Sequence, residues 1–354
     1  MRPRVWCVLC CAAAALLLSG CRVERRAGPE SVEALRVDRV FRLSERVALS
    51  AAAWSPDSLR LSFGTQGGVW TVGVADRAEQ FVAAAGTVTS VSWSRALDLL
   101  AYVDRGRLFT VKPDGSALRA VPLPGLATGV AWAPGSDRMA VSVLPDAPAE
   151  SRAQVWLASR DGGYRKLVVE SGAGAAVRTL QWFPDNLYLF YTTAAAGSPG
   201  VGEAWRVRIA YPDRVRLPLI PDSAAMVSLA PNGRDMAFVA TAGDEVRGDI
   251  RGMRTDGSVA RIMVPAAGRV AALTWAPQAD KIAYAVVRDE ANAEIWMADA
   301  SGRARARIAH YRMEFPDPHI ALSLVWAPDG RQIAFGTNTG SFTGPVWVAR
   351  LERR

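Results

Sequence analysis

Short runs of alternating apolar and polar residues recur along most of the chain, and each is bounded by a tight turn. Residues 281–285 (KIAYA) and 332–336 (QIAFG) are typical of these runs. Alternation with a period of two marks β-strands that bury one face, and the Pro, Asp and Gly residues between the runs are those that tight turns favour. The pattern therefore predicts an all-β protein of many short antiparallel strands.

The strands are grouped in a repeat, which is marked by a large apolar anchor residue directly before a turn. Seven first anchors occur, at Trp54, Trp93, Trp132, Trp182, Leu229, Trp275 and Trp326. A second anchor follows in each unit, at Trp70, Phe109, Trp156, Trp205, Ile250, Trp296 and Trp347. The first anchors are 39 to 51 residues apart, a period that suits one four-stranded propeller blade. We therefore expect a seven-bladed β-propeller of four-stranded antiparallel blades.

The tryptophans follow this repeat. Eleven of the 12 occupy first or second anchor positions. A fixed period favours packing between neighbouring blades over stacking platforms for sugars or bases.

The two ends of the repeat region complement each other. The last unit stops shortly after its third strand, at residues 346–351, so its outermost strand is missing. Residues 37–43 (VDRVFRL) alternate and precede the first anchor. We expect this N-terminal strand to pair with 346–351 and complete the last blade, because closure removes two exposed sheet edges.

The N-terminal residues have the features of an export signal. Arg2 and Arg4 precede an apolar run over 5–18, and the run leads into Leu18-Ser19-Gly20-Cys21. This tetrapeptide resembles the lipoprotein box of bacterial lipoproteins. The resemblance implies cleavage before Cys21 and attachment of acyl chains, such as palmitate, to that residue; several such chains hold a protein on a membrane.

The chain accordingly divides into three parts. We expect a signal peptide over residues 1–20, a lipidated cysteine and tether over 21–36, and a single propeller domain over 37–354. The mature chain would keep one cysteine, which leaves no disulfide to form in an exported domain. The predicted location is the bacterial cell membrane or outer membrane.

Composition narrows the possible chemistry. With 50% hydrophobic and 21% charged residues, the chain is too apolar to be disordered. Its two histidines, His310 and His319, cannot form a three-histidine zinc site. The sequence has no phosphate-binding glycine loop, no His-Glu-x-x-His and no Gly-x-Ser-x-Gly. We therefore predict no catalytic residues, no cofactor and no metal, and the even scatter of arginine with export disfavours nucleic acid as a partner.

The repeat also resembles a known family. The Trp-Ser-Pro-Asp turn at 54–57, followed by an alternating strand and an Asp-Gly turn as at 256–257, resembles the Pro-Asp repeats of TolB-type propellers. The resemblance covers residues 37–351 and implies the propeller fold. TolB has six blades and a further N-terminal domain, so its partners do not carry over to seven anchors and a tether. The propeller part of LpqB-type lipoproteins shares the anchor and similar turns.

Acidic residues gather in the loops between the second and third strands of the units, which differ in length and lie on one face of a propeller. The candidate partner-binding residues are Asp146, Glu150, Glu203, Asp244, Glu245, Asp249, Asp289, Glu290 and Glu294. Such loops suit a basic peptide, a cationic protein surface or a metal ion. The alternative is that they are charged for solubility.

A last candidate segment, residues 311–319, enters the final unit on the same face. Asp317 and His319 in this segment are also candidate partner-binding residues, and together with His310 they would make a small site that ligates a metal or relays a proton. The alternative is a proline-rigidified surface loop, because no third ligand is evident in the sequence.

These features predict a monomeric, non-enzymatic scaffold that is anchored to the membrane through Cys21 and binds another envelope protein or peptide. One alternative is an enzyme (a hydrolase, a lyase or a quinoprotein-like dehydrogenase) with Asp317 and His319 at the channel mouth. The other is a domain that senses a small ligand or Ca²⁺ through the acidic loops.

Overall fold

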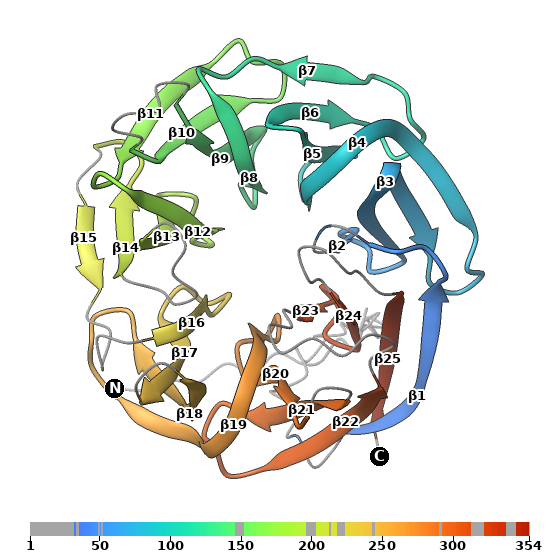
Figure 1. Cartoon of the computed structure of the whole chain (residues 1–354), viewed down its shortest axis with the longest axis vertical. Helices are drawn as coiled ribbons and strands as arrows, with labels where there is room; N and C mark the ends of the chain where they lie inside the picture. The colour runs from blue at the N-terminus through green and yellow to red at the C-terminus, as the bar shows by residue number, and fades with distance from the viewer. Residues whose placement is uncertain are drawn as a thin grey trace, which may run out of the picture.

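The computed structural model arranges antiparallel β-sheets in a ring around a common axis (Figure 1). It describes residues 32, 35–48, 50, 52–145, 152–195, 203–211, 214–217, 224–242, 245–289, 292–312, 322–337 and 345–353. Within these ranges no α-helix is present. The same residues include no helix long and apolar enough to cross a bilayer.

The described ranges contain 25 strands. They are β1 (Leu35–Ser44), β2 (Ala53–Trp54), β3 (Arg60–Gly73), β4 (Glu79–Trp93), β5 (Leu100–Asp104), β6 (Arg107–Val111), β7 (Arg119–Val121), β8 (Leu126–Trp132), β9 (Arg138–Leu144), β10 (Gln154–Ser159), β11 (Arg165–Glu170), β12 (Ala175–Trp182), β13 (Tyr188–Ala195), β14 (Glu203–Arg208), β15 (Arg214–Leu217), β16 (Ala224–Leu229), β17 (Asp235–Ala242), β18 (Glu245–Arg254), β19 (Arg261–Trp275), β20 (Lys281–Val287), β21 (Asn292–Asp299), β22 (Arg305–Arg312), β23 (Leu322–Trp326), β24 (Gln332–Thr337) and β25 (Val346–Arg353).

Strand order within the sheets is nearly sequential. Three sheets have four strands each, in the orders β1-β25-β24-β23, β11-β10-β9-β8 and β12-β13-β14-β15. A fourth runs from β2 to β7, and a fifth from β16 to β22. The predicted all-β, propeller-like arrangement of antiparallel sheets is therefore confirmed.

The two larger sheets each contain one long strand that changes partners along its length. The first part of β4, through Thr87, pairs with β3, and the part from Val88 onward pairs with β5. Likewise β19 pairs with β18 up to Arg269 and with β20 from that residue onward. Each long strand thus links two consecutive groups of strands around the ring (Figure 1).

The ring closes where the two ends of the described chain meet. β1 lies antiparallel to β25, with Val37 opposite Leu351 and Phe41 opposite Val348. The predicted pairing of 37–43 with 346–351 is therefore confirmed. A β-bulge at Asp38 interrupts the register.

The bulge in β1 changes which face its odd-numbered side chains occupy. Before it, Val37 packs in the core shared with β19–β22; after it, Phe41 packs in the core shared with β2 and β3. An inserted residue reverses the alternation of a strand, which lets one strand seal two neighbouring cores.

First-anchor tryptophans join neighbouring repeat units through their indole nitrogens. Three of them donate an Nε1–H hydrogen bond to the backbone oxygen of the residue directly before the first anchor of the preceding unit. These pairs are Trp54 with Val325 (3.0 Å), Trp182 with Ala131 (3.0 Å) and Trp275 with Ser228 (3.1 Å). Trp93 donates instead to the hydroxyl oxygen of Ser62, also at 3.0 Å. The buried rings therefore both fill the interface between neighbouring repeat units and fix its register.

The turns after the first anchors have nearly the same length and geometry. The five-residue connections 55–59, 133–137, 183–187, 230–234, 276–280 and 327–331 define one end of the ring, called here the turn face. In four of them the third residue, Asp57, Asp185, Asn232 or Asp329, accepts a hydrogen bond from the N–H two residues later. The side chain closes the turn locally. The Pro-Asp signature of the sequence is thus a turn-capping device.

The indole hydrogen bond can be tested with a matched pair of tryptophans. We expect Trp275→Phe to cost about 1 kcal/mol more unfolding free energy than Trp132→Phe, because it also leaves the buried Ser228 oxygen without its donor. Trp132 is equally buried, but its indole nitrogen has no hydrogen-bond partner among the described residues. Urea unfolding of both variants measures the difference. Equal losses would mean that the rings act by volume alone.

Candidate functional site

The end of the ring opposite the turn face carries connections of very different length. Connections 105–106, 145–153, 196–202, 243–244, 288–291 and 338–345 lie there, and they define the loop face. They vary from two to nine residues, whereas the turns after the first anchors barely vary. Antiparallel hairpins place alternate connections at opposite ends of a sheet, so these connections start and end on the side away from the turn face.

The structure describes part of the predicted acidic set on the loop face. The side chains of Glu203, Asp249, Asp289 and Glu294 are described, whereas β18 gives only the backbone of Glu245. The other predicted residues lie outside the described residues: Cys21, Asp146, Glu150, Asp244, Glu290, Asp317 and His319.

Glu294 is the most enclosed of the described acids. It is 9% exposed, and its carboxylate accepts hydrogen bonds from Arg288 (2.6 Å), Arg307 (2.9 Å) and the indole nitrogen of Trp296 (3.0 Å). Burial raises the pKa of the Glu294 carboxyl, but the donated hydrogen bonds and the charge of Arg288 outweigh burial and hold the pKa at about 2. The carboxylate is therefore a fixed anion that joins β21, β22 and the 288–291 connection.

Glu203 has a related role two positions before a second anchor. Three second-anchor tryptophans donate their indole N–H to the side chain two residues earlier in the strand. The pairs are Trp156 with Gln154 (2.8 Å), Trp205 with Glu203 (3.2 Å) and Trp296 with Glu294 (3.0 Å). Two of the predicted acidic residues therefore belong to a structural position of the repeat, which glutamine also fills.

Asp249 stabilises a long strand where it changes partners. Its carboxylate accepts a hydrogen bond from the N–H of Ala266 in β19 at 2.9 Å and lies 3.5 Å from Arg251. Asp104, which was not among the predicted residues, does the same for β4 by accepting from the N–H groups of Gly86 and Thr87. Both carboxylates thus stabilise the point at the loop face where a long strand changes its pairing partner.

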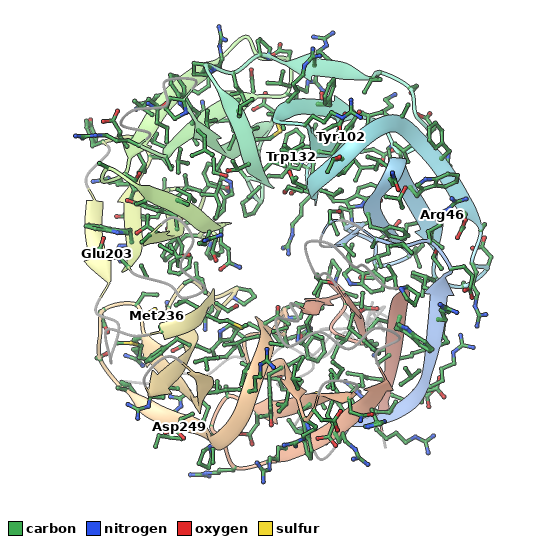
Figure 2. All side chains as sticks on the ribbon, in the orientation of Figure 1. Arg46, Tyr102, Trp132, Glu203, Met236 and Asp249 are labelled. Atoms are coloured by element: carbon green, nitrogen blue, oxygen red, sulfur yellow. The ribbon has the colours of Figure 1, made fainter. Side chains whose placement is uncertain are left out.

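The described acids do not converge on one point. Figure 2 places Glu203 and Asp249 toward the outer circumference of the ring, on two different sheets. Asp289 accepts hydrogen bonds from the amide of Asn292 at 2.8 and 2.9 Å. Among the described residues no group of three or more His, Cys, Asp or Glu side chains is placed to hold a metal ion.

One cavity lies on the turn face, at the seam where β1 and β25 meet the sheet that begins with β2. This seam cavity has a volume of about 630 Å³. Arg39, Phe41 and Arg350 line it from the closing sheet, and Leu59, Arg60 and Val74 line it from the next sheet.

A second cavity of about 420 Å³ occupies a similar inter-sheet position further round the ring. Asp98, Lys112, Leu118, Arg119, Arg160 and Asp161 are among the residues that line it. Neither cavity was predicted, because each is formed by residues from different repeat units whose relative register the sequence does not specify.

The chain matches no protein-family model and no curated protein. Several solved structures share its fold at low sequence identity. It matches a chain of the crystal structure of the mitotic checkpoint complex with a TM-score of 0.61 and 14% identity, over 98% of this chain and 99% of that one. It matches TolB from Acinetobacter baumannii with a TM-score of 0.51 and 13% identity, over 78% of this chain and 66% of that one. It matches hydrazine synthase from Kuenenia stuttgartiensis with a TM-score of 0.60 and 11% identity, over 89% of this chain and 97% of that one.

Identities this low show the fold alone. The neighbours support the propeller-like arrangement and include TolB, the family that the Pro-Asp repeats resemble. They also include an enzyme, so the fold does not decide whether this chain catalyses a reaction.

The role of Glu294 has a pH signature. We expect Glu294→Gln to lower the free energy of unfolding at pH 7 by about 2–3 kcal/mol, because it leaves Arg288 and Arg307 without their counter-charge. The folded-state pKa of about 2 lies below the ordinary value of 4.5. The stabilisation is therefore fully present above pH 4.5 and is lost as the pH falls from 4.5 toward 2.

Chemical unfolding at a series of pH values measures this effect, and the gap between wild type and variant should narrow over that window. Glu352→Gln is the control, since its ion pair with Arg36 is exposed and worth little. A gap that stays constant down to pH 3 would contradict the assignment.

Proposed function

We propose that the protein is a membrane-anchored bacterial lipoprotein whose seven-bladed propeller is a non-enzymatic scaffold, binding an envelope protein or peptide through its loop face. Export and acylation rest on the Leu18-Ser19-Gly20-Cys21 box. The propeller-like fold, with TolB among its neighbours, fits a scaffold role.

The proposal of seven blades is supported by dividing the two larger sheets at the points where their long strands change partners. The sheet from β16 to β22 divides within β19, and the sheet from β2 to β7 divides within β4. Each half then has four strands. In the half that contains β2, the long strand β3 counts as two strands, because its start pairs with β2 and its end pairs with β4. With the three four-stranded sheets, this division matches the seven first anchors.

The observation that carries the binding function is the contrast between the two faces. Turn-face connections after the first anchors are short and closed by their own side chains, whereas loop-face connections range from two to nine residues. Loops without a packing role are where recognition residues concentrate. The acids predicted there suit a basic partner. Asp249, which accepts from the N–H of Ala266, and Glu294, which accepts from Arg288, stabilise the backbone at this face.

The loop face can be tested by charge reversal in the intact lipoprotein. We expect Asp244→Lys with Glu245→Lys, and separately Asp289→Lys with Glu290→Lys, to abolish crosslinking to the partner in cells, since each pair changes the local charge by about four units. Crosslinked proteins are identified by mass spectrometry. The melting temperature should stay close to that of wild type.

The matched control changes the charge equally away from the loop face. Asp38→Lys with Asp137→Lys alters two exposed acids, on β1 and on the turn-face connection 133–137. We expect this control variant to crosslink to the partner as the wild type does. Capture that survives both loop-face variants, or is lost equally in the control, would contradict the proposed surface.

The anchor has its own test. We expect Cys21→Ala to move the protein from the membrane pellet to the soluble fraction with an unchanged melting temperature, because Cys21 precedes the propeller and carries the acyl chains. Cell fractionation and mass spectrometry of the N-terminal peptide measure both effects. An unacylated wild-type peptide, or a variant that remains in the pellet after a carbonate wash, would rule out lipid anchoring.

A further inference from the structure

Two arginines face each other across the seam that closes the ring. Arg39 of β1 lies directly opposite Arg350 of β25, and Arg350 lies opposite Gln332 of β24. All three side chains line the seam cavity, so they form one row of hydrogen-bond donors across three strands. Among the described residues, neither arginine has a carboxylate within ion-pairing distance.

The β-bulge creates this pair of like charges. Val37 lies opposite Leu351, so an unbroken register would place Asp38 opposite Arg350 and form an ion pair. The bulge at Asp38 brings Arg39 there instead. Like charges directly opposite one another destabilise a sheet, and bulges re-aim side chains beside binding sites. The observed register therefore replaces the favourable Asp38–Arg350 pair by the Arg39–Arg350 pair, whose two positive charges an anion would neutralise.

The opposite wall sets the charge of the cavity. Arg60, Asp57 and Asp76 line it there. One carboxylate oxygen of each aspartate is occupied in a turn, accepting from the N–H of Leu59 and of Ala78 respectively. Three arginines and two aspartates give the seam cavity a formal charge of +1, which one monoanion neutralises.

An apolar surface lies beside these charges. Phe41 and Val74 are each 8% exposed and belong to the core under the seam, and Leu59 is 62% exposed at the rim. The Arg39 guanidinium carbon lies 4.7 Å from the centroid of the Phe41 ring, which orients it. The cavity thus offers planar, bidentate donors next to an apolar patch, within the volume range of small-ligand sites.

We propose that the seam cavity binds a single carboxylate carried on an apolar body, with Arg39 and Arg350 clamping the carboxylate and Phe41, Leu59 and Val74 contacting the apolar part. Two sources supply this chemistry: the C-terminal residue of a peptide, and a free small organic acid. A phosphate dianion fits less well, because the two aspartates of the opposite wall would repel its second charge. The site is on the turn face, so the inference does not depend on the loop-face partner.

Binding is tested on the detergent-solubilised full-length protein at low ionic strength, by calorimetry and thermal shift. The probes are 4-methylpentanoate and its amide, acetyl-Gly-Gly-Leu with a free C-terminus and its C-terminal amide, and inorganic phosphate. We expect the two acids to bind about ten- to a hundredfold more tightly than their amides, because only the acids engage the guanidinium pair as anions. The tighter of the two acids identifies the source.

Substitution separates the clamp from the fold. Arg39→Gln with Arg350→Gln should weaken acid binding by at least about tenfold. Arg36→Gln is the control: it lies on the same strand, is exposed and does not line the cavity. Without ligand, Arg350→Gln should raise the melting temperature by about 1–3 °C, since it removes the like-charge pair. If Arg350 had only a structural role, the substitution would lower the melting temperature.

Several results would overturn the proposal. These are the absence of binding by both acids at millimolar concentration, amides that bind as tightly as acids, phosphate that binds more tightly than either acid, and a lower melting temperature for Arg350→Gln. Binding that survives the Arg39 and Arg350 substitutions but is lost with Arg119→Gln and Arg160→Gln would place the ligand in the second cavity instead.

Discussion

The indole groups of the first anchors are the interaction on which the ring depends. Sheets that pack face to face by apolar contact alone can slide against one another, because burial is not directional. An indole N–H that meets a fixed backbone oxygen of the preceding repeat unit, as Trp275 meets Ser228, removes that freedom. The same contact from Trp54 to Val325 joins the first sheet to the closing sheet and so spans the seam. At Trp54, Trp182 and Trp275, phenylalanine would fill the volume without setting the register.

The periodic anchors were enough to predict a propeller-like arrangement of antiparallel sheets, since periodic positions keep their meaning whatever the turns between them do. The pairing of residues 37–43 with 346–351 followed from a missing strand at one end and a spare strand at the other. The register of that pairing could not be predicted. Val37 and Phe41 alternate as if in one regular strand, and nothing local marks Asp38 as the bulged residue. The seam cavity was missed for the same reason.

The acidic loops show a different limit of sequence reasoning. The sequence makes Glu203 and Glu294 candidate partner-binding residues, yet each accepts the indole N–H of a second anchor. The signal was present, because Gln154 occupies the same position before Trp156 and a neutral amide there indicates a hydrogen-bond acceptor. Asp249 gave no such signal, because its partner Ala266 is 17 residues away in sequence and meets it only when β19 folds back. An acidic residue at the end of a loop can therefore stabilise the fold or bind a partner, and only its contacts in the structure distinguish the two roles.

Closure by the first strand also determines the order in which the chain is able to fold. β1 emerges from the ribosome long before β25, and the contact between Arg36 and Glu352 spans 316 positions of sequence. Until the last strand is made, the core around Phe41 lacks Val346 and Val348, and both β1 and β24 expose an unpaired edge. Strand β25 thus closes the ring by pairing with both β1 and β24. A truncated product, from an early stop or a nick near β25, would keep its other sheets but remain an open, aggregation-prone arc.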